Sequence, residues 1–316
     1  MAMLLADVGG TNARLALARN GVIDGDTVTR YRGDDHASFD DVVRQFLTEQ
    51  DQPRITGVCV AVAGPVSGGT ARLTNRDWDF SEDRLARLTD ADYCRLINDL
   101  TALGYATPVL RGEAVELLRA APDGRARNSQ ALVVGAGTGL NVCSVRALPG
   151  GTITCMEAEE GHTNLPANIM HRLTSALGDD ARAAFFSTEE TFAGRGLSRL
   201  HAMRTRSDAV RSEDIARAAE AGDPEAEATY ALFAELLGLL CRELALRFMP
   251  LEGMFLAGSV ARSMAHRMDQ FEAGFLADPF MRQIPSNTPI YLIRDDMAAL
   301  HGCLAALGPA GQGGGA

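Results

Sequence analysis

The stretch that decides the fold is Asp7-Val8-Gly9-Gly10-Thr11-Asn12-Ala13-Arg14, which lies between the apolar runs Met3-Leu4-Leu5-Ala6 and Leu15-Ala16-Leu17-Ala18. Apolar runs on both sides of a Gly-Gly pair predict a strand, a tight turn and a second strand. The glycines let backbone amides approach a ligand where a side chain would collide, and Thr11 and Asn12 add hydrogen-bond donors. The turn therefore predicts an anion site, with a phosphate as the expected ligand.

Asp7 immediately precedes this turn, and its carboxylate would repel a phosphate unless a cation lay between them. The combination predicts a hydrated divalent metal ion held by Asp7 through water, and therefore a nucleotide ligand. The alternative is a plain β-hairpin, in which Gly9 and Gly10 only make the turn while Asp7 and Asn12 form local hydrogen bonds.

A second segment, residues 131–145, repeats the pattern of apolar run, Gly-Thr turn and apolar run. The turn is Gly137-Thr138-Gly139, and when the two threonines are aligned, Val134 takes the place of Asp7. Two copies of one hairpin predict two related α/β units that each present a phosphate-contacting turn to a shared cleft. Only the first turn carries the carboxylate that a metal ion requires.

The composition is that of a globular protein with two domains: 316 residues, of which 46% are hydrophobic and 22% charged. A net charge of −11 argues against a nucleic-acid partner. The six cysteines form no CxxC pair, which favours reduced thiols in a cytoplasmic protein. The N-terminus lacks a signal-like segment, and charged residues interrupt the apolar stretch 230–248, so neither secretion nor a membrane partner is expected.

Strand and helix patterns alternate along the first third of the chain and predict an α/β fold with a mostly parallel sheet. The second half contains a helical block between residues 169 and 248. The final helix, 297–307, is expected to return to the first lobe. We therefore expect a small domain from residues 1–108 and 297–316, and a large domain from residues 109–296.

Asn98 and Asp99 lie where an apolar strand ends and a helix begins, which is where ligand sites form in open α/β sheets. Asp99 is suited to accept a proton from a substrate hydroxyl, while Asn98 holds a neighbouring hydroxyl. The alternative is that one of the two residues only caps the helix.

Glu159 and His162 follow another strand in an acidic turn, and Glu189 precedes the Gly194-Arg195-Gly196 turn. Carboxylates and imidazoles suit polyhydroxylated substrates because they accept hydrogen bonds from vicinal hydroxyls. A solvated acidic loop and a helix start rich in glutamate are the alternatives. Gly258 and Ser259, at another strand end, are weaker candidates for contact with a nucleotide base or ribose.

Taken in order, these segments resemble the bacterial glucokinase family, within the superfamily of sugar kinases and actin-like ATPases. The resemblance covers nearly the whole chain and is carried by residues 7–14, 73–75, 97–99, 135–140, 159–162, Glu189 with 194–196, and 256–258. It implies a two-lobed RNase H-like fold with a cleft between a small and a larger domain, and a homodimer. It also implies an ATP-dependent kinase that uses Mg²⁺ and converts glucose to glucose 6-phosphate, the entry step of glycolysis.

The resemblance further implies a role for each residue. Asp99 is the general base toward the sugar 6-hydroxyl. The other hydroxyls are held by Asn98, Glu159, His162 and Glu189, with help from Asn75. The nucleotide is contacted by Asp7 through magnesium and by Gly9, Gly10, Thr11, Asn12, Gly137, Thr138, Gly139, Gly258 and Ser259.

One position departs from the family pattern, because Glu160 stands where relatives usually have glycine. If the turn requires a positive φ, Glu160 is strained; if its side chain faces the pocket, it changes the sugar preference. A kinase for mannose or an aminosugar therefore remains an alternative, as does a non-catalytic sugar-sensing regulator. Such a regulator would normally carry a basic helix-turn-helix before the first turn, where only six residues precede Asp7.

Overall fold

The structure is a computed structural model that describes residues 1–73 and 76–308. The predicted sugar contact Asn75 lies outside the described residues. The chain divides into two compact units. Unit 1 contains Met1–Arg111, Leu148–Cys155 and the chain from Asp295; unit 2 contains Gly112–Ala147 and Met156–Arg294. We describe each unit by itself.

Unit 1 is built on a sheet with strand order β3-β2-β1-β5-β9, in which β4 also pairs with β2. Strands β1, β5 and β9 are parallel, whereas β1 and β2 form the antiparallel hairpin that the sequence predicts. The elements are β1 (Ala2–Val8), β2 (Asn12–Arg19), β3 (Val22–Ile23), η1 (Gly25–Thr27), β4 (Thr29–Arg32), η2 (Gly33–Asp35), α1 (Phe39–Glu49), β5 (Ile55–Val62), β6 (Val66–Ser67), β7 (Thr70–Arg72), β8 (Asp79–Ser81), α2 (Glu82–Thr89), β9 (Tyr93–Asn98), α3 (Asp99–Ala106) and α13 (Ala298–Leu307).

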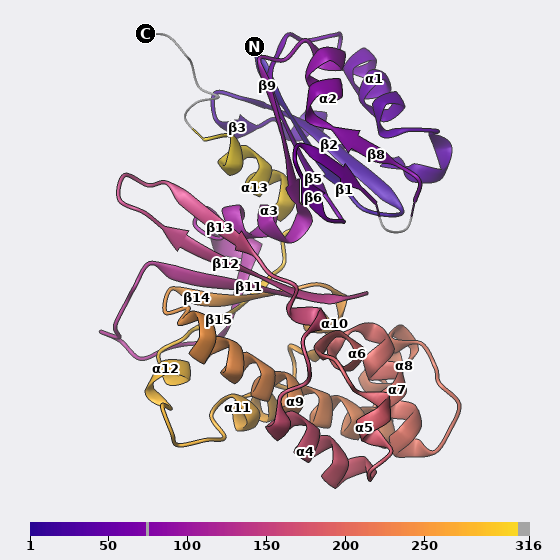
Figure 1. The fold of residues 1–316 in the computed structure, drawn as a ribbon, viewed down its shortest axis with the longest axis vertical. Coiled ribbons are helices and arrows are strands. Elements are labelled where there is room, and N and C mark those ends of the chain that lie inside the picture. Colours follow the sequence, from indigo (N-terminus) through magenta and orange to yellow (C-terminus); the bar gives the residue numbers. More distant parts are fainter. Residues whose placement is uncertain (74–75, 309–316) are drawn as a thin grey trace. The chain divides into compact units, whose positions relative to one another are not determined.

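Alternate residues of β1 supply the two faces of this sheet. Leu4 and Val8 join the core that α1 and α2 cover, and Met3 and Leu5 join the core that α3 and α13 cover. Asp7 continues the second series, so its side chain belongs to the face that α3 and α13 cover. Figure 1 shows α13 lying beside α3, and the two helices pack against each other within unit 1.

Unit 2 contains a sheet in which β10, β15, β14, β11 and β12 follow one another. Its long helix α9 packs against α11 (Figure 1) and is largely buried, as predicted for residues 230–248. The elements are η3 (Gly112–Ala114), β10 (Val115–Arg119), β11 (Gln130–Ala136), β12 (Leu140–Ala147), η4 (Glu160–His162), α4 (Ala167–Leu177), α5 (Ala181–Ala184), α6 (Thr188–Phe192), α7 (Gly194–Thr205), α8 (Ser212–Glu220), α9 (Pro224–Phe248), β14 (Gly253–Ala257), α10 (Ser259–Met264), α11 (Met268–Phe275), α12 (Gln283–Ser286) and β15 (Ile290–Ile293). Strand β13 (Ile153–Glu157) begins in the unit 1 segment Leu148–Cys155 and ends in unit 2.

The two sheets share one arrangement, which confirms the internal repeat. In unit 1 an antiparallel hairpin, β1 and β2, is extended by parallel strands β5 and β9. In unit 2 the hairpin β11 and β12 is extended by parallel strands β14 and β15. The two Gly-Thr turns therefore occupy equivalent places in their own sheets.

Val66 begins β6 and pairs with Ala71 in a small three-stranded sheet. Trp78 is buried and its ring lies against that of Phe39. In the described part of the chain, no helix combines the length and apolarity that a membrane span requires, and none of the six cysteines forms a disulfide.

The contact between α13 and α3 depends on Gly302, because a Cβ at that position would collide with the backbone carbonyl of Ala102. We expect Gly302→Ala to lower the free energy of unfolding by about 1–3 kcal/mol, since backbone atoms cannot move aside as a side chain can. Gly25→Ala is the matched control, because nothing lies within 4 Å of a Cβ built there. Thermal unfolding of the two variants tests this, and equal midpoints would contradict the packing argument.

Candidate active site

The carbonyl groups of the first turn, residues 9–12, are bound by the protein. The Gly10 carbonyl accepts a hydrogen bond from Arg76 Nε at 3.1 Å, and the Thr11 carbonyl accepts one from the Gly33 amide at 2.8 Å. The two polar ends of a trans peptide point in opposite directions, so the Thr11 N–H points away from Arg76. Within residues 1–73 and 76–308, the amides of Gly10 and Thr11 donate to no protein group.

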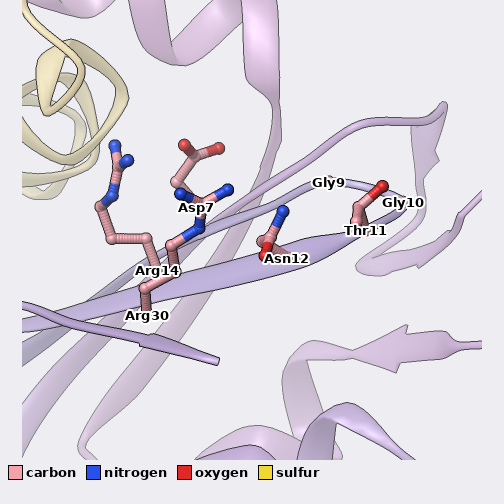
Figure 2. Close-up of a pocket in the computed structure, with 7 residues that line it drawn as sticks. All are labelled: Asp7, Gly9, Gly10, Thr11, Asn12, Arg14 and Arg30. Carbon is pink, nitrogen blue, oxygen red and sulfur yellow. The ribbon is translucent and has the colours of Figure 1, made fainter. Parts of the chain in front are cut away.

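This turn opens onto a cavity of about 310 Å³, and the nucleotide contacts predicted in the first turn are among the residues that line it (Figure 2). The lining consists of Asp7, Gly9, Gly10, Thr11, Asn12, Arg14 and Arg30. The sequence interpretation missed Arg14 and Arg30 as lining residues. Strand register explains both, because Asp7 pairs with Arg14 and Arg14 pairs with Arg30, which places all three on one face of the sheet.

Asp7 and Asp99 interact electrostatically in unit 1. Burial, followed by the negative charge of Asp99, raises the pKa of Asp7 from 3.8 to about 6, while Arg14 acts in the opposite direction. Burial also raises the pKa of Asp99. Two neighbouring carboxylates of this kind are stabilised in their charged forms by a cation.

Asn98 combines a structural role with remaining hydrogen-bonding capacity. Its Oδ1 accepts from the Leu100 amide at 2.9 Å, which caps α3 as the alternative interpretation expected. Its Nδ2 donates to the Gly64 carbonyl at 3.1 Å. One N–H of the same amide group is left for a ligand. Asn98 therefore fixes the start of the helix on which Asp99 is the first residue.

The second turn, residues 137–139, repeats the arrangement of the first. Its Gly137 carbonyl accepts from the Gly194 amide at 2.8 Å, and its Thr138 carbonyl accepts from Arg195 Nη1 at 3.3 Å. The N–H groups of Thr138 and Gly139 consequently point away from these partners. In the described ranges, neither amide donates a hydrogen bond to the protein.

Gly258 and Ser259 lie next to this second turn, as the interpretation of both as nucleotide contacts requires. A Cβ built on Gly137 would lie 3.8 Å from the Ser259 amide nitrogen. Gly258 has φ of +99°, and a Cβ there would collide with the Ala136 carbonyl. Glycine is therefore required at position 258 for the start of α10 to approach the turn.

Glu159 precedes the turn η4 and His162 is its last residue, and both residues are exposed. Asn141, at the start of β12, holds the turn by donating to Glu159 Oε2 at 3.2 Å and accepting from the Glu160 amide at 3.0 Å. The sequence interpretation missed Asn141. Its only local signal is its place two residues after Gly139.

Glu160 stands where glycine is usual, and the structure shows neither backbone strain nor a side chain directed into a pocket at this position. It does not have a positive φ, so its backbone is not strained. Its side chain is 6% exposed and pairs with Arg247 on α9. The acidic side chain is therefore neutralised inside unit 2, and the structure gives it a partner that a glycine would not need.

Glu189, on α6, is bonded directly to the second hairpin. Its Oε2 accepts from the Leu140 amide at 3.0 Å, and its Oε1 accepts from Arg195 at 2.5 Å. A Cβ at Gly139 would lie 2.6 Å from Glu189 Oε2, so a side chain there would displace this carboxylate. Unit 2 thus brings Glu159, Glu189 and the Gly137–Gly139 turn together around the start of β12.

The raised pKa of Asp7 predicts a stability change in Asp7→Asn. Since the folded-state pKa of about 6 exceeds the model-compound value of 3.8, the folded protein binds the extra proton between these pH values. Protonated Asp7 therefore contributes its full share to the free energy of unfolding below pH 3.8, and this contribution is lost as the pH rises to about 6. Metal-free Asp7→Asn should therefore unfold at a higher urea concentration than wild type at pH 7.5, with a smaller difference at pH 4.5. Asp92→Asn, at an exposed position, is the control, and an Asp7→Asn variant no more stable than wild type at pH 7.5 would contradict the argument.

Several known proteins are similar to this chain over nearly its whole length. The chain is 30% identical to the glucokinase of Cupriavidus metallidurans over 315 residues, which cover 96% of this chain and 92% of that protein. It is 28% identical to the glucokinase of Caulobacter sp., covering 98% and 96% of the two chains. Among solved structures, glucokinase from an Antarctic psychrotroph superposes with a TM-score of 0.84 at 27% identity, covering 97% of this chain and 98% of that one.

More distant structures share the fold. Glucokinase from Balamuthia mandrillaris, solved in complex with glucose, has a TM-score of 0.69 at 21% identity and covers 96% of this chain and 92% of its own. These similarities confirm the predicted α/β fold of the actin-like ATPase class. The sequence profile of the family described as Glucokinase matches residues 4–309. The chain therefore belongs to the glucokinase family, and the predicted class of ATP-dependent hexose kinase is confirmed with it.

Proposed function

We propose that the protein transfers the terminal phosphoryl group of ATP to the 6-hydroxyl of glucose. The observation that carries this proposal is the pair of turns whose carbonyls are held by protein. Their amides, at Thr11 in unit 1 and at Thr138 and Gly139 in unit 2, donate to no group of residues 1–73 and 76–308. Unpaired amides at glycine-containing turns are suited to bind the oxygens of a triphosphate.

The residues around Asp7 fit a magnesium ion. The described residues contain no cluster of three His, Cys, Asp or Glu side chains that would form a complete metal cage. Mg²⁺ is usually held by one or two carboxylates together with waters and substrate phosphates. Asp7 would hold it through water, and the ion would supply positive charge to the phosphates. Further positive charge comes from arginine alone, because the sequence contains no lysine.

Asp99 is placed to act on the sugar hydroxyl. It opens α3 at the carboxyl end of β9, and Asn98 fixes this start by its cap. Phosphoryl transfer depends mainly on alignment and charge compensation. A partly buried carboxylate with a raised pKa would orient the 6-hydroxyl and take its proton as the hydroxyl oxygen attacks phosphorus.

The remaining sugar contacts are proposed from the family resemblance together with the geometry of unit 2. Glu159, His162 and Glu189 would hold the other hydroxyls, with Asn98 and Asn75 contributing from unit 1. Glu159 and Glu189 are both bonded to the start of β12, which supports their acting in one site. A homodimer in the cytoplasm, the family expectation, is tested by light scattering and by cell fractionation.

A coupled assay with ATP, magnesium and a panel of hexoses tests the proposed reaction. Glucose should be phosphorylated faster than mannose or an aminosugar. A fast reaction with another sugar and none with glucose would overturn the choice of substrate, and activity with no sugar would overturn the proposed function itself.

Asp99→Ala should lower kcat by about 10²–10⁴-fold, the usual contribution of a general base. Sugar affinity, measured by calorimetry, should stay within a fewfold of wild type, because the other sugar contacts remain. Asp92→Ala, at an exposed position of the same unit, controls for the loss of an acidic side chain. If Asp99→Ala turns over at the wild-type rate, Asp99 is not the base.

Glu160→Gly restores the residue usual in the family but removes the partner of Arg247. The turn η4 should then be held less firmly, so the KM for glucose should rise severalfold while kcat changes little. Arg247→Gln removes the same pair from the other side and should raise the KM in the same way. Unchanged KM values in both variants for every sugar tested would show that the pair has no influence on the site.

A further inference from the structure

The side chain of Arg195, at the start of α7, connects three groups of unit 2. Its Nη2 donates to Glu189 Oε1 at 2.5 Å, its Nε donates to Glu190 Oε1 at 2.6 Å, and its Nη1 donates to the Thr138 carbonyl at 3.3 Å. The side chain is 45% exposed. One guanidinium group therefore contacts both a carboxylate proposed to bind sugar and the turn proposed to bind phosphates.

The backbone strengthens the same connection. The Gly194 amide, one residue before Arg195, donates to the Gly137 carbonyl at 2.8 Å. The Leu140 amide, just after the turn, donates to Glu189 Oε2 at 3.0 Å. A movement of the turn would therefore alter the hydrogen bonds of both Glu189 oxygens, Oε2 through Leu140 and Oε1 through Arg195.

Glu190 does not require Arg195 as its only cation. Arg199 Nη1 lies 2.8 Å from Glu190 Oε2, so this carboxylate stays paired when Arg195 is redirected. The contacts of Arg195 that have no such substitute are those to Glu189 and to the Thr138 carbonyl. Charge-assisted bonds of this kind are directional and depend on the fork geometry of arginine.

We propose that Arg195 is a positioning residue that couples nucleotide binding to sugar affinity. The proposal rests on the proposed function. With the phosphate turn empty, the guanidinium neutralises Glu189, which weakens that carboxylate as an acceptor for a sugar hydroxyl. A phosphate that accepts the Gly139 N–H polarises the Thr138–Gly139 peptide, so the Thr138 carbonyl becomes a stronger acceptor for Arg195. The guanidinium is then drawn away from Glu189, and that carboxylate becomes a stronger acceptor for the sugar hydroxyl. Nucleotide and sugar therefore increase each other's affinity.

The test measures the Kd of glucose by calorimetry, with and without saturating Mg-AMPPNP, in wild type, Arg195→Gln and Arg195→Lys. In wild type the nucleotide should tighten glucose binding by about fivefold or more, within the usual range of coupling. In Arg195→Gln this factor should fall to less than about twofold. Arg195→Lys keeps the charge but cannot reach all three acceptors, so its factor should fall between the two. By linkage, glucose must change the Kd of Mg-AMPPNP by the same factor in each protein.

Arg217→Gln is the matched control, because Arg217 is an arginine of unit 2 that forms an ion pair with Asp214 within α8. Its coupling factor should equal that of wild type. If wild type is active and the nucleotide tightens glucose binding equally in wild type and Arg195→Gln, the proposed coupling is wrong but the proposed function stands. The same holds if the nucleotide does not change the glucose Kd of an active wild type. If Arg195→Gln does not fold, a factor in Arg195→Lys equal to that of wild type contradicts it. A wild type that phosphorylates no hexose contradicts the proposed function and the coupling together.

Discussion

The site depends on how the carbonyl groups of two turns are held. A trans peptide fixes the N–H opposite the C=O, so a protein group that binds the carbonyl also determines where the amide points. Arg76 and Gly33 do this for the first turn, and Gly194 and Arg195 do it for the second. These partners come from segments distant in the sequence from the turn that they hold. The anion-binding property of each turn is therefore a property of its whole unit.

Charge distribution is the second constraint. The chain carries a net charge of −11, and the Asp7–Asp99 pair adds negative charge beside the first turn, which is where phosphates are proposed to bind. Arg14 and Arg30 line the same cavity as Asp7. Opposed arginines on adjacent strands repel each other, and an anion between them reduces that repulsion. The buried acids and these arginines together suit a ligand that combines a metal cation with phosphate.

The sequence predicts those parts of the molecule that local patterns determine. The hairpins at Asp7–Arg14 and at residues 131–145 follow from apolar runs on both sides of glycine turns, and the repeat of that pattern corresponds to the equivalent sheets. The cap on α3 follows from Asn98 at a strand end. Asp7, Asp99 and the turn glycines are recognisable for the same reason, because each belongs to a short run of consecutive residues that is typical of a ligand site.

Other parts depend on register and on distant contacts, which no local pattern contains. Arg30 reaches the cavity because β4 pairs with β2 in a particular register. The consequence of Glu160 could not be settled from its own turn, since its partner Arg247 follows 87 residues later. The sequence around Arg195 predicts only a glycine turn, and the hydrogen bond from Arg195 to the Thr138 carbonyl forms only in the folded unit.

The most direct test of the central claim is an amide NMR experiment on the protein labelled with ¹⁵N, titrated with Mg-AMPPNP in the presence of glucose. If the unpaired amides bind the triphosphate, the signals of Thr11, Thr138 and Gly139 should shift strongly as the nucleotide saturates. Nucleotide binding that leaves these three signals in place would contradict the account.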